Sequence, residues 1–255
     1  MNFQRKIALM FLTRFELLNH KIWENYFDNQ LFNVYIHPEI GYELKNFSNF
    51  QIPNLAPKAK GYNFLASFEL LKESFNNKDN YKFVLLSEDC IPLTDSKIFY
   101  DYCTKDNYSN IRYGKTWLEP GHPRFINEVD KENQMANADW WMMNRENVQT
   151  LLEKEDDIKK YSKYINNGEH TPSTILHISG QLNDNYVKNK DILYENYNFI
   201  DLGGDYSDFC YEQITEIKED LFKRGYYFLR KYKSNNKKYS TFVYHKHWAG
   251  IRDYD

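Results

Sequence analysis

The sequence contains little cysteine and no long hydrophobic run. Its three cysteines, Cys90, Cys103 and Cys210, lack the spacing of a metal site and cannot all pair within the chain, so we expect a reducing compartment. The apolar segment 7–12 is too short for a signal-peptide core or a membrane span, and charged residues follow it directly. These features predict a soluble, cytoplasmic protein without a signal peptide, membrane anchor or integral membrane segment.

An excess of positive charge is also missing. The chain has 33 Lys and Arg against 36 Asp and Glu, a net charge of -3, which argues against a nucleic-acid partner. The charge is unevenly distributed, because residues 223–246 contain many Lys and Arg but no Asp or Glu. This basic segment is the most favourable place in the chain for an anion site.

Aromatic residues, in contrast, are abundant. They make up 18% of the chain, including 22 Tyr and 18 Phe, and Tyr-rich surfaces suit sugars because a ring can stack on a sugar's apolar face. With 42% hydrophobic and 27% charged residues, the chain is expected to fold. No repeat or linker divides it, so we expect one domain over 1–255, with a first half 1–105 and a second half 106–255.

Apolar patterning at the start of the chain predicts strand, helix and strand. Residues 6–13 and 32–37 form short buried runs, and 14–29 has apolar residues at helical spacing between them. A further helix is expected over 62–74, before the apolar strand 82–86. This order predicts an α/β fold with a mostly parallel central sheet flanked by helices.

Shorter elements are predicted in the remainder. Periodicity fades over the long loop 108–137. We expect a helix to Cys103 capped by Asp95 or Ser96, a strand 139–143, a helix 145–153 capped by Asn144, a surface helix within 154–167, a helix from Thr171 to Gly180 capped by Thr171, a strand 197–202, a helix 212–224 and edge strands at 226–229 and 239–244.

The strand 82–86 ends in polar residues. Ser87, Glu88 and Asp89 follow it directly, and Pro92 excludes an ordinary central strand after them. In open α/β sheets, polar groups at the carboxyl end of a buried strand face a ligand crevice. On this stretch alone, a solvated acidic turn is an equally good interpretation.

Four segments, in this order, resemble the core-2/I-branching β-1,6-N-acetylglucosaminyltransferases and their plant relatives. They are KIALMFLTR at 6–14 with VYIH at 34–37, FVLLSEDCIPL at 83–93, DWWMMNRE at 139–146 and GEHTPSTIL at 168–176, with a weaker fifth match, YFLRKY, at 227–232. The resemblance implies a GT-A-like nucleotide-sugar domain that is inverting and needs no metal or other cofactor. The implied partners are a UDP-sugar donor, most simply UDP-GlcNAc, and a carbohydrate acceptor. UDP-glucuronic acid or another UDP-sugar stays open.

The resemblance also implies residue roles. By match to the family motif, Glu169 is the general base that takes the proton of the acceptor hydroxyl. The residues alone favour another interpretation, in which Glu169 merely complements the N-terminus of the next helix. By match to the family, Arg230 and Lys231 would hold the donor diphosphate. Position at the ends of predicted strands adds Thr13, Arg14, His37, Ser87, Glu88 and Asp89 to the donor site. Arg124, Trp140 and Trp141 are the acceptor candidates, and one of the two tryptophans is expected in the core because neighbours in a strand point to opposite faces. A structural role is equally expected for a lone histidine such as His37.

The chain departs from the family pattern at one motif position and in two larger features. The family's Asp before the base is Gly168 here, and the membrane anchor and the stem cysteines are missing, which argues against Golgi residence and a mucin-type acceptor. Two other functions therefore stay open. One is a catalytically inactive protein of the same fold that binds a nucleotide or glycan. The other is a metal-dependent hydrolase or phosphotransferase built on Glu88, Asp89, Asp201 and Asp205.

Overall fold

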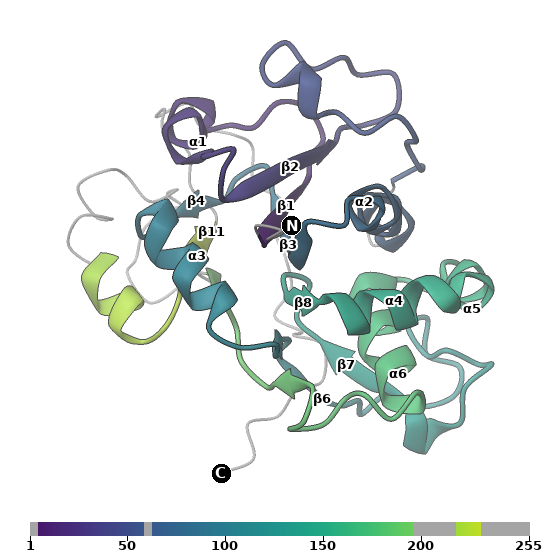
Figure 1. Ribbon diagram of the computed structural model, residues 1–255. Coiled ribbons are helices and arrows are strands. Elements are labelled where there is room, and N and C mark those ends of the chain that lie inside the picture. Colours follow the sequence, from purple (N-terminus) through teal and green to yellow (C-terminus); the bar gives the residue numbers. More distant parts are fainter. Residues whose placement is uncertain (1–4, 59–62, 196–217, 231–255) are drawn as a thin grey trace, which may run out of the picture.

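The computed structural model describes residues 5–58, 63–195 and 218–230, and Figure 1 shows a central sheet with helices on both faces. Within these residues, six strands form the sheet in the order β2-β1-β3-β8-β5-β9. β2, β1 and β3 are parallel, β8 is antiparallel to both neighbours, and β5 is parallel to β9. The strands are β1 Lys6–Leu12, β2 Phe32–His37, β3 Asn80–Ser87, β5 Ser109–Asn110, β8 Met142–Asn144 and β9 Val187–Lys188. The predicted α/β fold with a mixed, mostly parallel sheet is confirmed.

The central strands are buried on both faces, as their continuous apolar sequences predict. Alternate residues of β1 enter different cores: Ala8 and Met10 pack on one side, and Leu9 and Phe11 on the other. The first core contains side chains from α2 Phe64–Asn76, α4 Arg145–Glu153, α5 Glu155–Tyr161 and α6 Thr171–Ile178, and the second contains side chains from α1 His20–Tyr26 and α3 Ser96–Thr104. The result is a three-layer α/β/α arrangement (Figure 1).

The register of the parallel strands brings three strand ends to one edge of the sheet. Leu12 of β1 pairs with His37 of β2 on one side and with Ser87 of β3 on the other. The residues that follow these positions therefore lie together, at the edge where open α/β sheets bind ligands.

Smaller sheets extend this edge. In the described ranges, β10 Leu193–Glu195, β11 Phe228–Arg230 and β4 Ile91–Pro92 form a three-stranded sheet in that order. β11 pairs antiparallel with β4, the strand immediately after Ser87-Glu88-Asp89, so Arg230 at the end of β11 reaches the end of β3. The strand predicted near 226–229 is confirmed with its bounds shifted to β11, but it is the central strand of this sheet and not an edge strand. Pro92 lies in the edge strand β4, where proline is tolerated.

The predicted long loop 108–137 is more ordered than its sequence suggests. It contains β5, the antiparallel pair β6 Tyr113–Lys115 and β7 Met135–Asn137, and the 3₁₀ turn η2 Lys131–Asn133. Two further 3₁₀ turns, η1 Ser48–Phe50 and η3 Asn167–Glu169, lie elsewhere in the chain.

Some predicted bounds are wrong. The helix expected over 14–29 is α1, which begins at His20. The Leu18 N–H donates to the Glu88 carbonyl and the Arg14 carbonyl accepts from the Glu39 N–H, so these two groups cannot form a helical bond with each other. The strand expected from 139 begins at Met142. Thr171 is the first residue of α6 and His170 is its cap. The predicted strands 197–202 and 239–244 lie outside the described residues. None of the helices in the described ranges has the length and apolar character needed to cross a membrane.

Candidate active site

Glu88 joins the end of β3 to the segment that follows β1. The backbone N–H of Arg14 donates to the Glu88 carboxylate, and Arg14 Nε lies 2.9 Å from Glu88 Oε1. The Glu88 side chain is 13% exposed, whereas that of Arg14 is 77% exposed. Glu88 therefore fixes this loop, and Arg14 carries a positive charge to the open side of the sheet edge.

Arg230 gathers the other predicted donor residues. Its Nε lies 2.9 Å from Ser87 Oγ and 3.1 Å from Asp89 Oδ1, and the Ser87 hydroxyl donates to the same Asp89 oxygen. The guanidinium also lies over the ring of Trp140, 4.8 Å from its centroid, a cation–π contact. Residues predicted from three separate motifs thus meet in one cluster, with Arg230 at its centre.

Lys58 is a charged residue at this edge that sequence reasoning missed. Its Nζ donates to the backbone carbonyl of Thr13 and, at 3.2 Å, to that of His37, so one ammonium group joins the ends of β1 and β2. Glu39 Oε2 lies 4.0 Å from the same nitrogen. Burial lowers the pKa of Lys58 to about 8. A single Lys inside a loop carries no sequence pattern that would have revealed these contacts.

His37 and Thr13 do not offer their side chains to a donor, and these two predictions are corrected. His37 is 0% exposed, and its Nε2 accepts from the Ala56 N–H at 2.9 Å while its Nδ1 lies 2.8 Å from the Pro38 carbonyl. Burial, and then the charge of Lys58, lower the pKa of His37 to about 4, so the ring is neutral at pH 7. Thr13 is 1% exposed, and its hydroxyl donates to the Phe15 carbonyl.

Glu169 and Arg124, predicted as base and acceptor contact, lie together. Arg124 Nη1 is 3.2 Å from Glu169 Oε2, and Asn166 Nδ2 donates to Glu169 Oε1 at 3.2 Å. Both charged side chains are 22% exposed, so the carboxylate is held by its partners and still reaches solvent. An anchored carboxylate with partial access is a suitable geometry for a general base.

The turn that carries Glu169 is fixed from two sides. Asn137 Nδ2 donates to the Gly168 carbonyl at 2.9 Å, and Asn137 Oδ1 accepts from the Ser173 N–H at 3.2 Å. Asn167 Oδ1 accepts from the Phe64 N–H at 3.1 Å, which attaches the turn to the start of α2. These bonds replace the simple helix cap expected from the sequence.

Trp140 and the preceding Asp139 connect the two parts of the site. A Cβ on Gly168 would lie 3.1 Å from Asp139 Oδ1, which places this carboxylate beside the Glu169 turn. Trp140 packs against both cores and contacts Arg230. Trp141, in contrast, is 1% exposed, so its predicted contact with the acceptor is wrong and its role is in the core. The sequence prediction that one of these two tryptophans is a core residue is confirmed.

His170 follows Glu169 and adds a buried polar group. It is 3% exposed, and its Nε2 has no hydrogen-bond partner among the described residues. Burial, followed by the nearby charge of Arg124, lowers the pKa of His170 to about 4. The hydroxyl of Thr171 and Nε1 of Trp140 are likewise buried without a described partner. The walls of the site therefore keep unsatisfied hydrogen-bonding capacity.

The described carboxylates at the sheet edge pair with cations and are not arranged as a metal site. Across the described ranges, no three His, Cys, Asp or Glu side chains gather in a way that could hold a metal ion. Glu88 and Asp89 instead pair with Arg14 and Arg230. Three residues considered from the sequence, Lys231, Asp201 and Asp205, lie outside the described residues.

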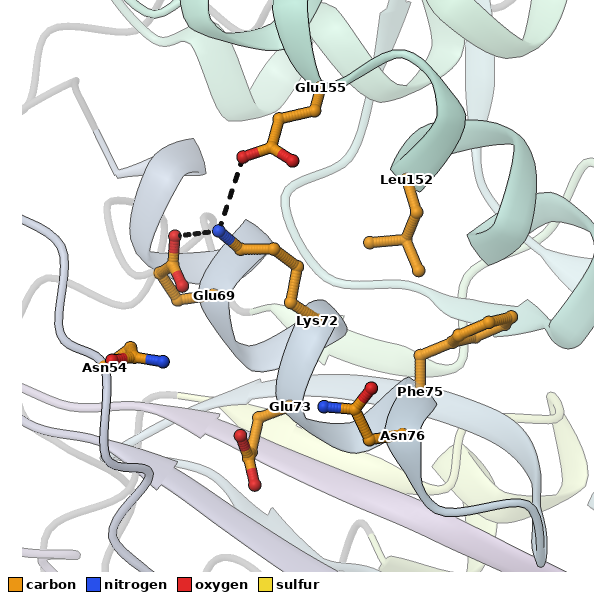
Figure 2. Close-up of a pocket in the computed structure, with 8 residues that line it drawn as sticks. All are labelled: Asn54, Glu69, Lys72, Glu73, Phe75, Asn76, Leu152 and Glu155. Atoms are coloured by element: carbon orange, nitrogen blue, oxygen red, sulfur yellow. Dashed lines mark hydrogen bonds and ion pairs between the residues drawn. The ribbon is translucent and has the colours of Figure 1, made fainter.

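A separate cavity of about 380 Å³ lies between α2 and the start of α5, and none of the site residues lines it (Figure 2). Its lining cation, Lys72, pairs with Glu69 at 2.5 Å and Glu155 at 3.5 Å. Among the described residues, three carboxylates, those of Glu69, Glu73 and Glu155, line this cavity against one cation, and its position excludes it from the chemistry at the sheet edge.

Comparison with known proteins finds similarity in sequence to one protein and similarity in fold to solved structures. Glycosyltransferase BC10 of rice, Oryza sativa subsp. japonica, is 23% identical over 172 residues, which cover 62% of this chain and 43% of the rice protein. The chain thus matches less than half of that relative's length. A crystal structure of galactosyltransferase LgtC has a TM-score of 0.43 and 10% identity, covering 79% of this chain and 80% of its own. Mouse xyloside xylosyltransferase 1 has a TM-score of 0.43 and 9% identity, covering 88% and 97%.

A family model decides the assignment. The model described as Core-2/I-branching enzyme matches residues 7–219. This span includes β1 from its second residue, β2, β3 and every described candidate residue except Arg230. It confirms the resemblance seen in the sequence motifs. The chain belongs to the Core-2/I-branching enzyme family.

Proposed function

We propose that this protein is an inverting glycosyltransferase that moves a sugar from a UDP-sugar to a hydroxyl of a carbohydrate acceptor. The observation that carries the proposal is the Glu169 carboxylate, held by Arg124 and Asn166 on a rigid turn and connected through Asp139 and Trp140 to the Arg230 cluster. In this proposal, residues 1–105 bind the nucleotide, and 106–255 provide the acceptor side and the basic segment.

Glu169 acts as the general base. As the acceptor oxygen attacks the anomeric carbon, its proton passes to the Glu169 carboxylate, and the bond between that carbon and the phosphate oxygen breaks. Attack from the face opposite to the diphosphate inverts the configuration at the anomeric carbon. Arg124 and Asn166 support this role because they fix both carboxylate oxygens without burying them.

Arg230 stabilises the departing nucleoside diphosphate, with Lys231 proposed beside it. The Arg230 guanidinium is oriented by Asp89, Ser87 and Trp140, and an oriented guanidinium can bind two phosphate oxygens at once. Arg14 adds positive charge from the end of β1. Preorganised charge of this kind stabilises a leaving group without reorganisation during the reaction.

The same contacts support a reaction without a metal. A divalent ion on Glu88 or Asp89 would have to displace Arg14 or Arg230 from its carboxylate. Family membership supports UDP-GlcNAc as the first donor to test, followed by UDP-glucuronic acid.

The test measures UDP release and glycoside product in EDTA, with each UDP-sugar and a panel of simple glycosides as acceptors. We expect one donor to turn over, and Glu169→Gln to lower kcat by about 10²–10⁴-fold while UDP still raises the Tm. Glu128→Gln is the matched control, because this carboxylate pairs with Lys163 on the surface. Turnover by Glu169→Gln close to that of the native protein would remove Glu169 from this role. No turnover with any donor would contradict the proposed activity.

A further inference from the structure

Trp117 is an exposed aromatic side chain that the site described above does not use. It is 50% exposed, on the segment between β6 and η2. A single exposed apolar residue is ordinary in a folded protein. Trp117 becomes informative through the residues that it contacts.

A chain of contacts leads from Trp117 to Glu169. The rings of Trp117 and His122 meet edge to face, with centroids 5.5 Å apart and an interplanar angle of 72°. His122 Nδ1 accepts from the backbone N–H of Arg124 at 3.2 Å. Arg124 Nη1 then lies 3.2 Å from Glu169 Oε2. The exposed indole and the proposed base are therefore connected through two intervening residues.

The segment that bears Trp117 is anchored. Leu118, next to Trp117, is 3% exposed, and Gln134 ties the segment together by bonding both the N–H and the carbonyl of Ile126, each at 3.0 Å. The Pro123 carbonyl accepts from the Ile165 N–H at 3.2 Å, just before the Glu169 turn. The indole is thus presented from a backbone that is attached to the segment before the Glu169 turn.

We propose that Trp117 is a stacking platform for a pyranose ring of the acceptor glycan. The indole offers an exposed, apolar face, and an aromatic ring can cover the apolar face of a sugar while the hydroxyl groups stay hydrated. The His122 ring packs edge to face with the indole, and this contact fixes the orientation of the exposed indole face. This proposal rests on the proposed glycosyl transfer and names a specificity-determining residue for its acceptor.

We assign the sugar on Trp117 to the acceptor and not to the donor, because the contacts of Trp117 lead to Glu169. The Glu169 carboxylate would receive the acceptor's proton. The diphosphate is assigned to the separate cluster of Arg230, Ser87 and Asp89 at the end of β3. A sugar on Trp117 would therefore hold the part of the acceptor glycan that extends away from the reacting hydroxyl.

The experiment compares the native protein with Trp117→Ala, Trp117→Phe and Ile98→Ala. Ile98 is the control for loss of an exposed apolar side chain, because it is 44% exposed on α3, outside the site. Binding of the methyl glycosides of β-galactose, β-N-acetylglucosamine and α-N-acetylgalactosamine is titrated by saturation-transfer NMR. The Tm with and without UDP reports the fold and the donor site.

We expect Trp117→Ala to weaken binding of at least one glycoside by about tenfold and Trp117→Phe to weaken it less. Ile98→Ala should bind as the native protein does, and UDP should raise the Tm of all variants equally. Equal glycoside affinity in Trp117→Ala, or no saturation transfer to any glycoside with the native protein, overturns the proposal.

The two proposals fail in different ways. Glycoside binding that depends on Trp117, without turnover of any UDP-sugar, contradicts the transfer and supports the platform. Turnover with an unchanged acceptor KM in Trp117→Ala supports the transfer and overturns the platform.

Discussion

Arg124 and Glu169 are 45 positions apart in the sequence, yet Arg124 Nη1 lies 3.2 Å from Glu169 Oε2. The contact joins the segment between β6 and β7 to the turn before α6. Together with Asn166, it leaves the carboxylate held at both oxygens and open on one side. A general base must be oriented as well as ionised, and this pair supplies the orientation.

Removing the Arg124 side chain should therefore reduce turnover without affecting donor binding. For Arg124→Gln we expect kcat to fall by about tenfold or more, because the Glu169 carboxylate loses the cation that holds its Oε2. Steady-state kinetics and UDP titration measure the two quantities. Lys163→Gln is the control, since it removes a cation from an exposed pair with Glu128. An unchanged kcat in Arg124→Gln would mean that Arg124 does not orient the base.

Arg230 should control affinity for the nucleotide. For Arg230→Ala we expect UDP affinity to fall by about tenfold or more, because a charge-assisted, two-point phosphate contact is lost. Arg230→Lys should recover part of this loss, since it keeps the charge but not the planar group over Trp140. Calorimetric titration of UDP in EDTA gives the values.

A matched variant tests whether UDP affinity depends on the position of Arg230 or on the overall positive charge of the basic segment. Lys223 belongs to the same basic segment, but its exposed side chain pairs only loosely with Glu219, at 3.9 Å. Lys223→Ala should bind UDP as the native protein does. Equal losses in Lys223→Ala and Arg230→Ala would mean that the basic segment acts as a diffuse charge rather than through Arg230.

The sheet edge could be predicted because its information is local. Buried strands are recognisable in a sequence as apolar runs, and parallel pairing brings the ends of such strands together. The positions of Glu88, Asp89 and Arg14 at this edge were therefore predicted from the sequence. The helix predicted to begin at Arg14 was overextended for a non-local reason. A helix from Arg14 would direct the Leu18 N–H to the Arg14 carbonyl. This N–H donates instead to the distant Glu88 carbonyl, and the Arg14 carbonyl accepts from the Glu39 N–H.

The roles of single side chains were harder to predict, because they depend on burial. His37 has the position of a ligand-binding residue, but the loop that reaches Ala56 covers it and occupies its Nε2. Trp140 and Trp141 are adjacent residues of the same type, but Trp140 contacts Arg230 whereas Trp141 is buried in the core. Lys58 acts on two strand ends through contacts across 45 and 21 positions, which no local pattern records.

Two buried histidines should make the fold sensitive to mild acid. The pKa values of His37 and His170 are lowered from 6.5 to about 4 by burial. Between pH 6.5 and 4 the unfolded chain binds protons at these sites and the folded chain does not, so stability falls as the pH falls through this window. The loss should be about 2 kcal/mol per histidine by pH 5.

Urea unfolding at pH 7 and pH 5 measures this loss. His170→Asn should be less stable at pH 7 but should lose about 2 kcal/mol less between the two pH values. His20→Gln, which changes a partly exposed histidine, should lose as much as the native protein. The same loss in His170→Asn as in the native protein would show that protonation of His170 does not drive the acid sensitivity.

Gly168 lies beside Asp139, and the Asp that the family has at position 168 should destabilise this protein. A Cβ at position 168 would lie 3.1 Å from Asp139 Oδ1, so any side chain forces that carboxylate to move. Gly168→Asp, which restores the family's residue, also places a second negative charge there. We expect it to lower the free energy of unfolding by about 1–3 kcal/mol, with a smaller loss for Gly168→Ala. Adding Asp139→Asn to Gly168→Asp should recover part of the loss, because it removes the like charge. If urea unfolding instead shows Gly168→Asp to be as stable as the native protein, then Asp139 does not occupy the space of the missing side chain.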